Sequence, residues 1–321
     1  MDPAQFLTAS RVIIVAGKGG VGKTAVTATL AVAASSIGLR VLVVEVEGKD
    51  SMASMFETNQ LSYTELELIA AATDHAGVHA RTVTPDDALL DYLNERGLQR
   101  LSKRLVSTGL LDMIATAIPG IRDILVLGKV KQLERSGTFD LILVDAPAAG
   151  HAITFLRSAS GLADAVSVGP INAQATEVLD LLTDPERCRV MLVTIPEETP
   201  VNELIETAYS LEDTVGVALG PVVVNGIHPE LAGLSVDPEV AAERAGVALV
   251  AGEADALRDA AAFRTSRTSL QHAQLDRMAE VLPLPQIRLP DLFTSSLGRD
   301  ELDRLGNELL RQVAELPETS A

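Results

Sequence analysis

A phosphate-binding motif between a strand and a helix is the feature that most constrains this fold. Residues 17–24, GKGGVGKT, complete the G-x-x-x-x-G-K-[ST] pattern, between an apolar run at residues 12–15 and an alanine-rich segment. Glycines let a backbone wrap an anion without Cβ clashes, so that successive N–H groups point at its oxygens. The N-terminus of the following helix adds partial positive charge and free donors. The pattern therefore predicts a phosphate-binding loop.

The residues of this loop have separate expected roles. We expect Lys23 to bridge the β- and γ-phosphates of a triphosphate, and the Thr24 hydroxyl to ligate Mg²⁺. The predicted nucleotide-binding residues of the loop are Gly17, Gly19, Gly20, Val21, Gly22, Lys23, Thr24 and Ala25. The expected cofactors are ATP and Mg²⁺.

A second lysine, Lys18, stands directly after the first glycine. This position marks the deviant Walker A loops of ATPases that work as face-to-face dimers. In those proteins the lysine reaches the partner's nucleotide, as an arginine finger does in trans. A solvated loop lysine is the alternative. The loop thus predicts a dimer as well as a bound nucleotide.

Two further strands are expected to end in acidic residues. The run at residues 41–47 is apolar enough to be covered on both faces, as strands of parallel sheets are. It carries Glu45 and Glu47, which the strand period of two points the same way. Glu47, nearest the tip, is the first choice for holding the attacking water; a solvated loop carboxylate is the alternative.

Asp145 ends the other of these strands, residues 139–145, in the Walker B arrangement. The predicted metal ligands are therefore Thr24 and Asp145, the latter directly or through water. Residues 146–151 are predicted as a loop of small residues, which suits a switch because its backbone can approach a phosphate and then release it. His151 is expected either to sense that motion or to pack at the start of a helix.

Strands that alternate with helices predict a doubly wound, mostly parallel α/β sheet. Residues 49–72 are expected to be mixed loop and helix. Further strands are predicted at residues 78–83, 165–168, 190–195 and 221–224, with a last short strand after Pro283 and Pro285 and a helix at 297–316. Asn225, at the tip of one strand, is expected to pair with adenine or to form an Asn-Gly turn with Gly226.

Two helix-rich segments, residues 84–136 and 230–280, are expected to form a helical lobe inserted in a single domain over residues 1–321. Residues 84–87 start a helix with Thr at the cap, Pro at the first position and an acid at the third. A leucine-rich run follows. These leucines serve either as internal packing or as an exposed groove for an apolar partner.

Composition excludes several classes of function. The formal net charge of −18, from 44 acidic and 26 basic residues, disfavours nucleic acid and anionic lipid as partners. No run approaches the roughly 18 apolar residues of a membrane span. The N-terminus lacks the pattern of a signal peptide. Cys188 is the only cysteine, so this chain alone forms no internal disulfide or CxxC clip. We expect a cytoplasmic protein.

These motifs together resemble the ArsA/Get family of P-loop ATPases. That family includes arsenite-pump subunits, the targeting factor for tail-anchored proteins and actinobacterial anion-transporting ATPases. The matching stretches are residues 17–24, 145–151 (DAPAAGH against the family's D-T-A-P-T-G-H), 195–201, 224–225 and 282–285, with residues 44–48 and 119–125 closest to the actinobacterial branch. The resemblance implies that Asn225 reads adenine, and that Pro283 and Pro285 flank it.

Departures from the family pattern change the expected activity. Glu47 stands where the family has an aspartate that positions water, which predicts slower hydrolysis or a better site in a partner chain. The pump's arsenite-binding cysteines and the targeting factor's zinc-binding CxxC have no counterpart, so arsenite and zinc are not expected ligands. The chain is about half as long as tandem pump subunits, so a second chain must complete the interface.

The leading hypothesis is a Mg²⁺-dependent ATPase that acts as a homodimer or with a paralogue. Its ATP-driven closure would be coupled to membrane-linked transport or to protein targeting, through a membrane protein or an apolar client. Its catalytic residues would be Lys18, Lys23 and Glu47. The alternative is a nucleotide-gated binding scaffold with little hydrolysis of its own, which works with a paralogous ATPase subunit.

Overall fold

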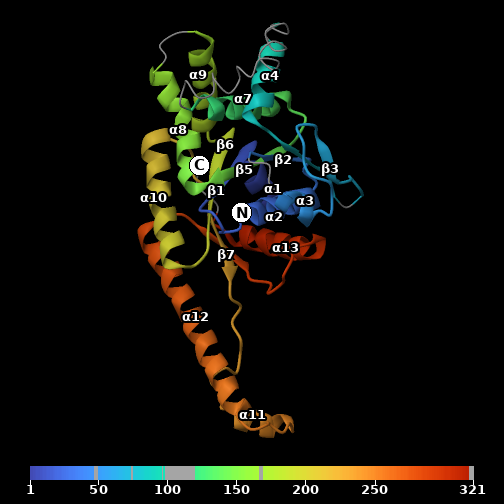
Figure 1. Cartoon of the computed structure of the whole chain (residues 1–321), viewed down its shortest axis with the longest axis vertical. Helices are drawn as coiled ribbons and strands as arrows, with labels where there is room; N and C mark the ends of the chain where they lie inside the picture. The colour runs from blue at the N-terminus through green and yellow to red at the C-terminus, as the bar shows by residue number, and fades with distance from the viewer. Residues whose placement is uncertain (47–49, 74, 96, 98–119, 166–168, 318–321) are drawn as a thin grey trace.

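The computed structural model describes residues 1–46, 50–73, 75–95, 97, 120–165 and 169–317 (Figure 1). Their centre is an eight-stranded sheet of order β3-β4-β2-β5-β1-β6-β7-β8. The strands are β1 (Val12–Gly17), β2 (Val41–Glu45), β3 (Leu66–Ile69), β4 (Val78–Thr82), β5 (Leu141–Ala148), β6 (Cys188–Thr194), β7 (Val222–Ile227) and β8 (Gln286–Pro290). Neighbouring strands are parallel except for the antiparallel pair β3 and β4. The predicted α/β class is confirmed.

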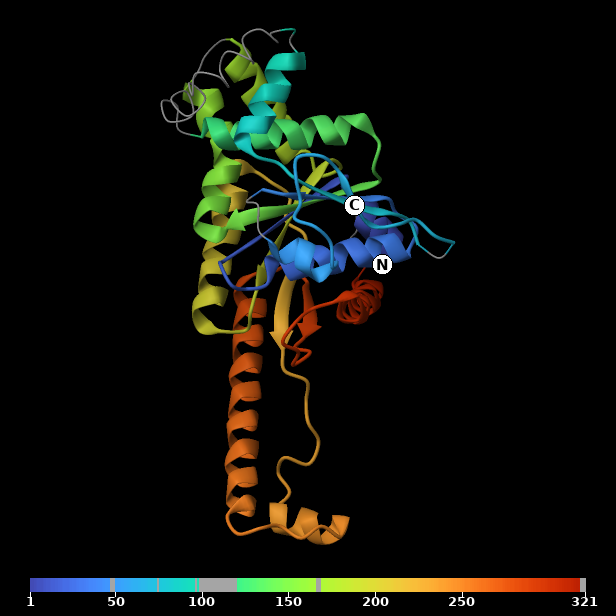
Figure 2. The same ribbon diagram turned by 45° about the vertical axis from the view of Figure 1, so that its right-hand side comes forward.

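Helices cover both faces of the sheet (Figure 2). One face packs on α1, α2, α3 and α13, and the other packs on α7, α8, α9, α10 and the base of α12. The helices of the described residues are α1 (Pro3–Thr8), α2 (Lys23–Ser36), α3 (Asp50–Met55), α4 (Pro85–Glu95), α7 (Ile121–Ser136), α8 (Ala149–Ala165), α9 (Pro170–Thr183), α10 (Glu198–Val215), α11 (Pro238–Ala245), α12 (Glu253–Val281) and α13 (Arg299–Glu315). This two-sided cover makes the fold doubly wound.

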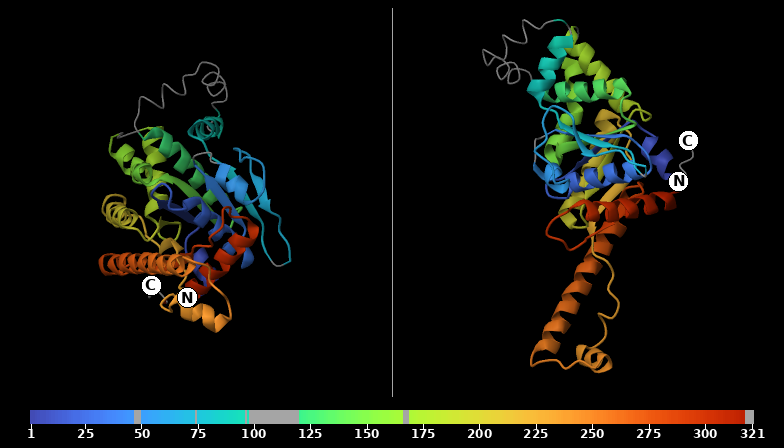
Figure 3. Two further views of the ribbon diagram at one scale, coloured as in Figure 1. Left: turned by 60° about the horizontal axis from the view of Figure 1, so that its bottom comes forward. Right: turned by 90° about the vertical axis from the view of Figure 1, so that its right-hand side faces the viewer.

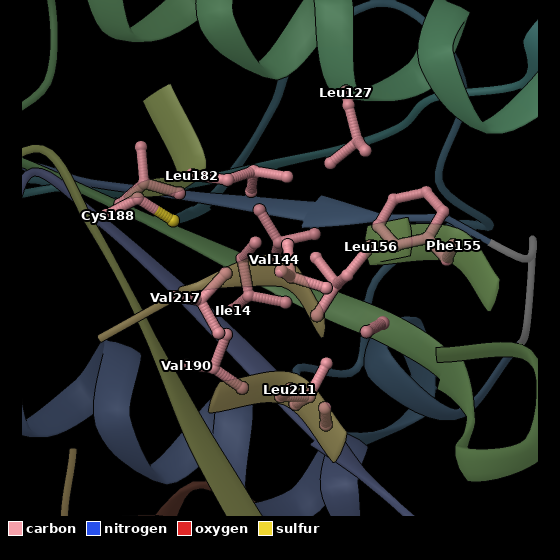
Figure 4. Packing of buried hydrophobic residues seen from close by; sticks show 14 of the residues in the cluster. Ile14, Leu127, Val144, Phe155, Leu156, Leu182, Cys188, Val190, Leu211 and Val217 are labelled. Carbon is pink, nitrogen blue, oxygen red and sulfur yellow. The ribbon is translucent and has the colours of Figure 1, made fainter. Parts of the chain in front are cut away.

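Two hydrophobic cores follow from the alternation of side chains along the central strands. Ile14 and Val144 face the α7–α10 layer, where they join Leu127 and Phe155 (Figure 4). Ile13, like its neighbours on that side of β1, faces α2 and α13. Because both faces are buried, the central strands contain uninterrupted apolar runs rather than an alternating pattern.

Three predicted boundaries were wrong. Residues 66–69 form the edge strand β3 rather than loop or helix; four residues, of which only Ile69 is buried, give too short a pattern to recognise. Ala165, predicted to begin a strand, ends α8, and residues 166–168 lie outside the described residues. The small residues expected as a loop at 146–151 instead complete β5 and start α8 without a connecting loop, so His151 lies in the first turn of a helix.

The segments predicted as a helical lobe lie at opposite ends of the molecule (Figures 1 and 3). Helices α4 and α7 lie beside α8 and α9 at one end. At the other end, residues 228–270 form a projection, here called the arm, that contains α11 and the outer part of α12. Much of the leucine-rich run, residues 98–119, lies outside the described residues, so its packing stays a prediction.

The arm has almost no core of its own. Helix α11 contains no buried residue, and the buried residues of α12 are confined to its base at Gln271, Leu275 and Met278. Large apolar side chains of the arm are exposed, among them Val250 (72%), Phe263 (74%) and Leu270 (58%). Among the helices of the described residues, none is both long and apolar enough to cross a membrane.

Candidate functional site

The glycine loop lies where the carboxyl ends of the central strands meet. Strand β1 ends at Gly17, and α2 begins at Lys23. Gly22 has φ of 89°, and a Cβ built on it would lie 2.2 Å from Nδ2 of Asn225. A Cβ on Gly17 would lie 2.3 Å from the backbone oxygen of Val193. A side chain at Gly17 would therefore clash with the backbone of β6, and one at Gly22 would strain the left-handed backbone and displace the Asn225 side chain.

Lys23 is buried, with only 6% of its surface exposed, although it carries a charge. Its ammonium donates a hydrogen bond to the backbone oxygen of Lys18 at 3.1 Å, across the base of the loop. The Lys23 side chain, at the start of α2, thus points back toward the glycine loop. This is the position from which a lysine can contact phosphates bound by the loop.

Thr24 and Asp145 meet beside the loop. The Thr24 hydroxyl donates to Oδ2 of Asp145 at 2.7 Å, and Asp145 is 3% exposed. Parallel pairing places Asp145 level with Val15 of β1, just before the loop. A hydroxyl and a carboxylate are the hard oxygen ligands that Mg²⁺ takes, usually completed by phosphate oxygens and water. The donor set therefore fits the predicted magnesium site.

Glu45 provides a second buried carboxylate at this edge. It is 1% exposed, lies level with Asp145 on the adjacent strand and accepts a hydrogen bond from the Thr82 hydroxyl at 3.2 Å. Glu45 and Asp145 follow Val43 and Leu143 by two residues. Because residues two apart in a strand face the same way, both acids face the side of the sheet that packs on α2. Glu47, the preferred candidate from the sequence, lies outside the described residues.

A cavity of about 260 Å³ adjoins the loop. Ala25 and Asn225, both predicted to bind the nucleotide, line it together with residues 289–292 and 294–297. Asn225 lies within β7 and donates from Nδ2 to the backbone oxygen of Val21 at 3.1 Å, so the side chain contacts the glycine loop directly. The Asn-Gly pair thus belongs to an irregular strand end rather than to a connecting turn.

Pro283 and Pro285 are not brought to this cavity. Both precede β8, and the Pro285 oxygen accepts a hydrogen bond from the Val222 nitrogen at the start of β7. The two prolines therefore lie at the amino ends of these strands, whereas the cavity lies at the carboxyl ends. The residues that follow β8, beginning with Pro290 and Asp291, line the cavity instead. The sequence signal for these missed residues was their position after a predicted parallel strand, because ligands of such sheets bind beyond the carboxyl ends of the strands.

Lys18 points to another contact. Its ammonium lies 2.6 Å from Oε1 of Glu203 on α10, and both side chains are more than a third exposed. The structure therefore gathers the loop residues, Thr24, Asp145 and Asn225 in one place, with Lys18 turned toward α10.

The glycine loop between a central parallel strand and a helix, with Asp145 beside Thr24, defines a P-loop nucleoside triphosphatase. The family model described as "anion-transporting ATPase" matches residues 10–167. ATPase BagA of Mycobacterium tuberculosis is 32% identical over 95% of this chain and 94% of that protein. This chain belongs to the anion-transporting (ArsA) ATPase family.

More distant relatives carry two other names. The arsenical pump-driving ATPase of Escherichia coli is 25% identical, over 66% of this chain and 39% of its own length. ATPase get3 of Schizosaccharomyces japonicus is 27% identical, over 56% of each chain. The predicted resemblance to the ArsA/Get family is confirmed.

Proposed function

We propose that this chain is a Mg²⁺-dependent ATPase whose nucleotide-driven closure requires a second protomer. The observation that carries the Mg²⁺-dependent ATPase is the 2.7 Å contact between Thr24 and Asp145 at the opening of the glycine loop. Those are the two side chains that would hold Mg²⁺, and they meet where the loop would hold phosphates. Membership of an ATPase family supports the same conclusion.

Each residue then has one task. The loop backbone and Lys23 bind the phosphates, and Asn225 with Ala25 orients the adenine end in the adjoining cavity. Bound Mg²⁺ would supply charge neutralisation between the β- and γ-phosphates. We assign the attacking water to Glu47, two residues after Glu45 in the sequence; Glu45 ends β2 and is level with Asp145 of β5. Lys18 completes the charge neutralisation from a neighbouring protomer.

The partner is proposed to be a second copy or a paralogous ATPase. Lys18 stands on a loop at the carboxyl edge of the sheet, and its side chain is 37% exposed, so a partner docked there can meet it. The coupled process would be transport or targeting at a membrane, which a cytoplasmic protein would reach through a membrane protein or an apolar client. Arsenite is not proposed as a ligand, because the sole thiol, Cys188, is buried.

A binding scaffold with little hydrolysis is the second candidate function. The exposed apolar side chains of the arm, such as Phe263, favour it, because apolar surface of this kind marks an interaction site. In single-turnover assays, tight ATP binding without phosphate release, alone or with a paralogue, would support the scaffold. Phosphate release at a rate that depends on Lys18 would support the ATPase.

Substitution of the two lysines tests the proposed site. Lys23→Ala should abolish turnover and weaken Mg-ATP binding, because it removes the buried ammonium of the loop. Lys18→Ala should leave Mg-ATP affinity nearly intact and lower turnover by about a thousandfold or more, the usual contribution of a cationic finger in trans. Calorimetry and phosphate release measure the two effects, and wild-type turnover in both variants would contradict the proposed site.

A further inference from the structure

Lys18 already has an acidic partner within its own chain. Its ammonium and Oε1 of Glu203 are 2.6 Å apart, and 185 residues separate them in the sequence. The side chains are 37% and 39% exposed, so the pair sits at the surface where a partner would arrive. An ammonium held at this distance by one carboxylate must leave it, or turn away from it, to contact phosphates of another protomer.

Glu203 stands on a firmly packed element. Its neighbours on α10, Val201 and Leu204, are 0% and 5% exposed and belong to the core under the sheet. The hydroxyl of Thr207, one turn later, donates to the backbone oxygen of Glu203 at 2.6 Å. The carboxylate is therefore presented from a packed helix, whereas Lys18 lies on the loop between β1 and α2.

Helix α10 is fixed on its other side by the base of the arm. Arg277 of α12 donates to Oδ1 of Asn202 at 2.5 Å, directly beside Glu203. Arg267 pairs with Glu197, which precedes the helix, at 2.5 Å. Asn202 and Glu197 thus contact α12, whereas the carboxylate of Glu203 contacts the phosphate loop through Lys18.

We propose that Glu203 is a positioning residue that holds Lys18 within its own protomer until a partner's nucleotide competes for the ammonium. This inference rests on the proposed function. Breaking the Lys18–Glu203 ion pair costs little, because a partly exposed ion pair changes an equilibrium constant, here that of dimerisation, by a factor of only about 1.5 to 5. Glu203 thereby raises the protomer concentration at which the catalytic pair forms.

The test is Glu203→Gln, with Glu206→Gln as the matched control. Glu206 lies three residues further along α10 and is exposed, and the carboxylate that contacts Lys18 is that of Glu203, so Glu206→Gln removes the same charge without removing that contact. Both changes are made in the wild-type chain and in Lys18→Gln. The measurements are ATP affinity by calorimetry, ATP-dependent dimerisation by sedimentation, and turnover as a function of protein concentration.

Glu203→Gln should lower the protein concentration for half-maximal turnover, and the dimer dissociation constant with ATP, by a factor of about 1.5 to 5 for each Lys18–Glu203 pair that dimerisation breaks. ATP affinity and turnover at saturating protein should not change, whereas a purely structural defect would lower both. The effect should vanish in the Lys18→Gln background, and Glu206→Gln should match its parent.

Three results would overturn the inference. If Glu203→Gln matches Glu206→Gln while the wild type binds ATP and depends on Lys18, Glu203 has no positioning role but the proposed function stands. The same conclusion follows if the shift persists without Lys18. If the wild-type chain neither binds Mg-ATP nor pairs with a second copy, the proposed function fails and the role of Glu203 fails with it.

Discussion

At the scale of single residues, burial decides the reactivity of Cys188. Cys188 begins β6 in the centre of the sheet and is 0% exposed. Burial disfavours the charged thiolate and raises the pKa of Cys188 to about 12, against a smaller opposing effect of the Arg187 charge. A thiol is a metal ligand and nucleophile only as the thiolate, so this sulfur is chemically inert in the folded chain.

This burial predicts that Cys188 does not react with thiol reagents under native conditions. At pH 8 only about one thiol in ten thousand would be ionised, given a pKa of about 12. Labelling with an aromatic disulfide should proceed only as fast as the protein unfolds, and completely in denaturant. Cys188→Ala gives the background, and stoichiometric labelling of the folded chain within minutes would contradict the prediction.

At the scale of elements, close approach of helices depends on small residues. Helix α13 crosses α2 where Gly306 meets Ala33. A Cβ built on Gly306 would lie 3.5 Å from the Ala33 nitrogen and 3.6 Å from its Cα, which is ordinary van der Waals contact. The interface therefore has room for one more methyl group but not for a long side chain.

Gly306→Ala should raise the free energy of unfolding by about 0.5 to 1 kcal/mol, because alanine restricts the unfolded chain and favours the helix interior. Gly306→Leu should lower it by about 1 to 3 kcal/mol through overpacking against α2. Urea unfolding of the two variants measures the difference. A destabilised Gly306→Ala protein would show that the helices cannot accept the methyl group.

At the scale of the whole molecule, the arm and the sheet are nearly independent in packing. The arm is joined to the remainder at its base, where Gln271 donates to the Gly226 oxygen at 3.1 Å and accepts from the His228 nitrogen at 2.9 Å. Arg264 reaches across to the Pro229 oxygen at 2.9 Å, so the two chain segments of the arm lie close together there.

Replacing residues 231–262 with a short glycine–serine linker should leave the sheet folded. The closed loop is short, and the removed segment contributes no buried core residue. We expect the midpoint of thermal unfolding to change by only a few degrees, with Mg-ATP affinity preserved. A loss of the cooperative transition would show instead that the arm stabilises the domain. Gln271→Ala in the full-length chain measures separately the contribution of the hydrogen bonds to Gly226 and His228 at the base of the arm.

The site was predictable where chemistry depends on neighbours in sequence. The glycines, Lys23 and Thr24 follow one another on a strand, loop and helix, so their spacing alone indicates a phosphate loop. Asp145 was predictable for a similar reason, because an acid at the end of a buried parallel strand must reach the same edge of the sheet. Local order and strand period fix these positions whatever the remaining topology.

Contacts between distant segments required the folded chain. Asn225 and Val21 are 204 residues apart, and Lys18 and Glu203 are 185 apart, so no local pattern reveals either pair. Because β8 pairs with β7 in parallel, its carboxyl end at Pro290 rather than Pro285 lies beside the cavity, and α12 projects from the opposite end of the molecule to α4. Periodicity tells which face of an element is buried, whereas the element that covers that face is chosen by packing of the whole chain.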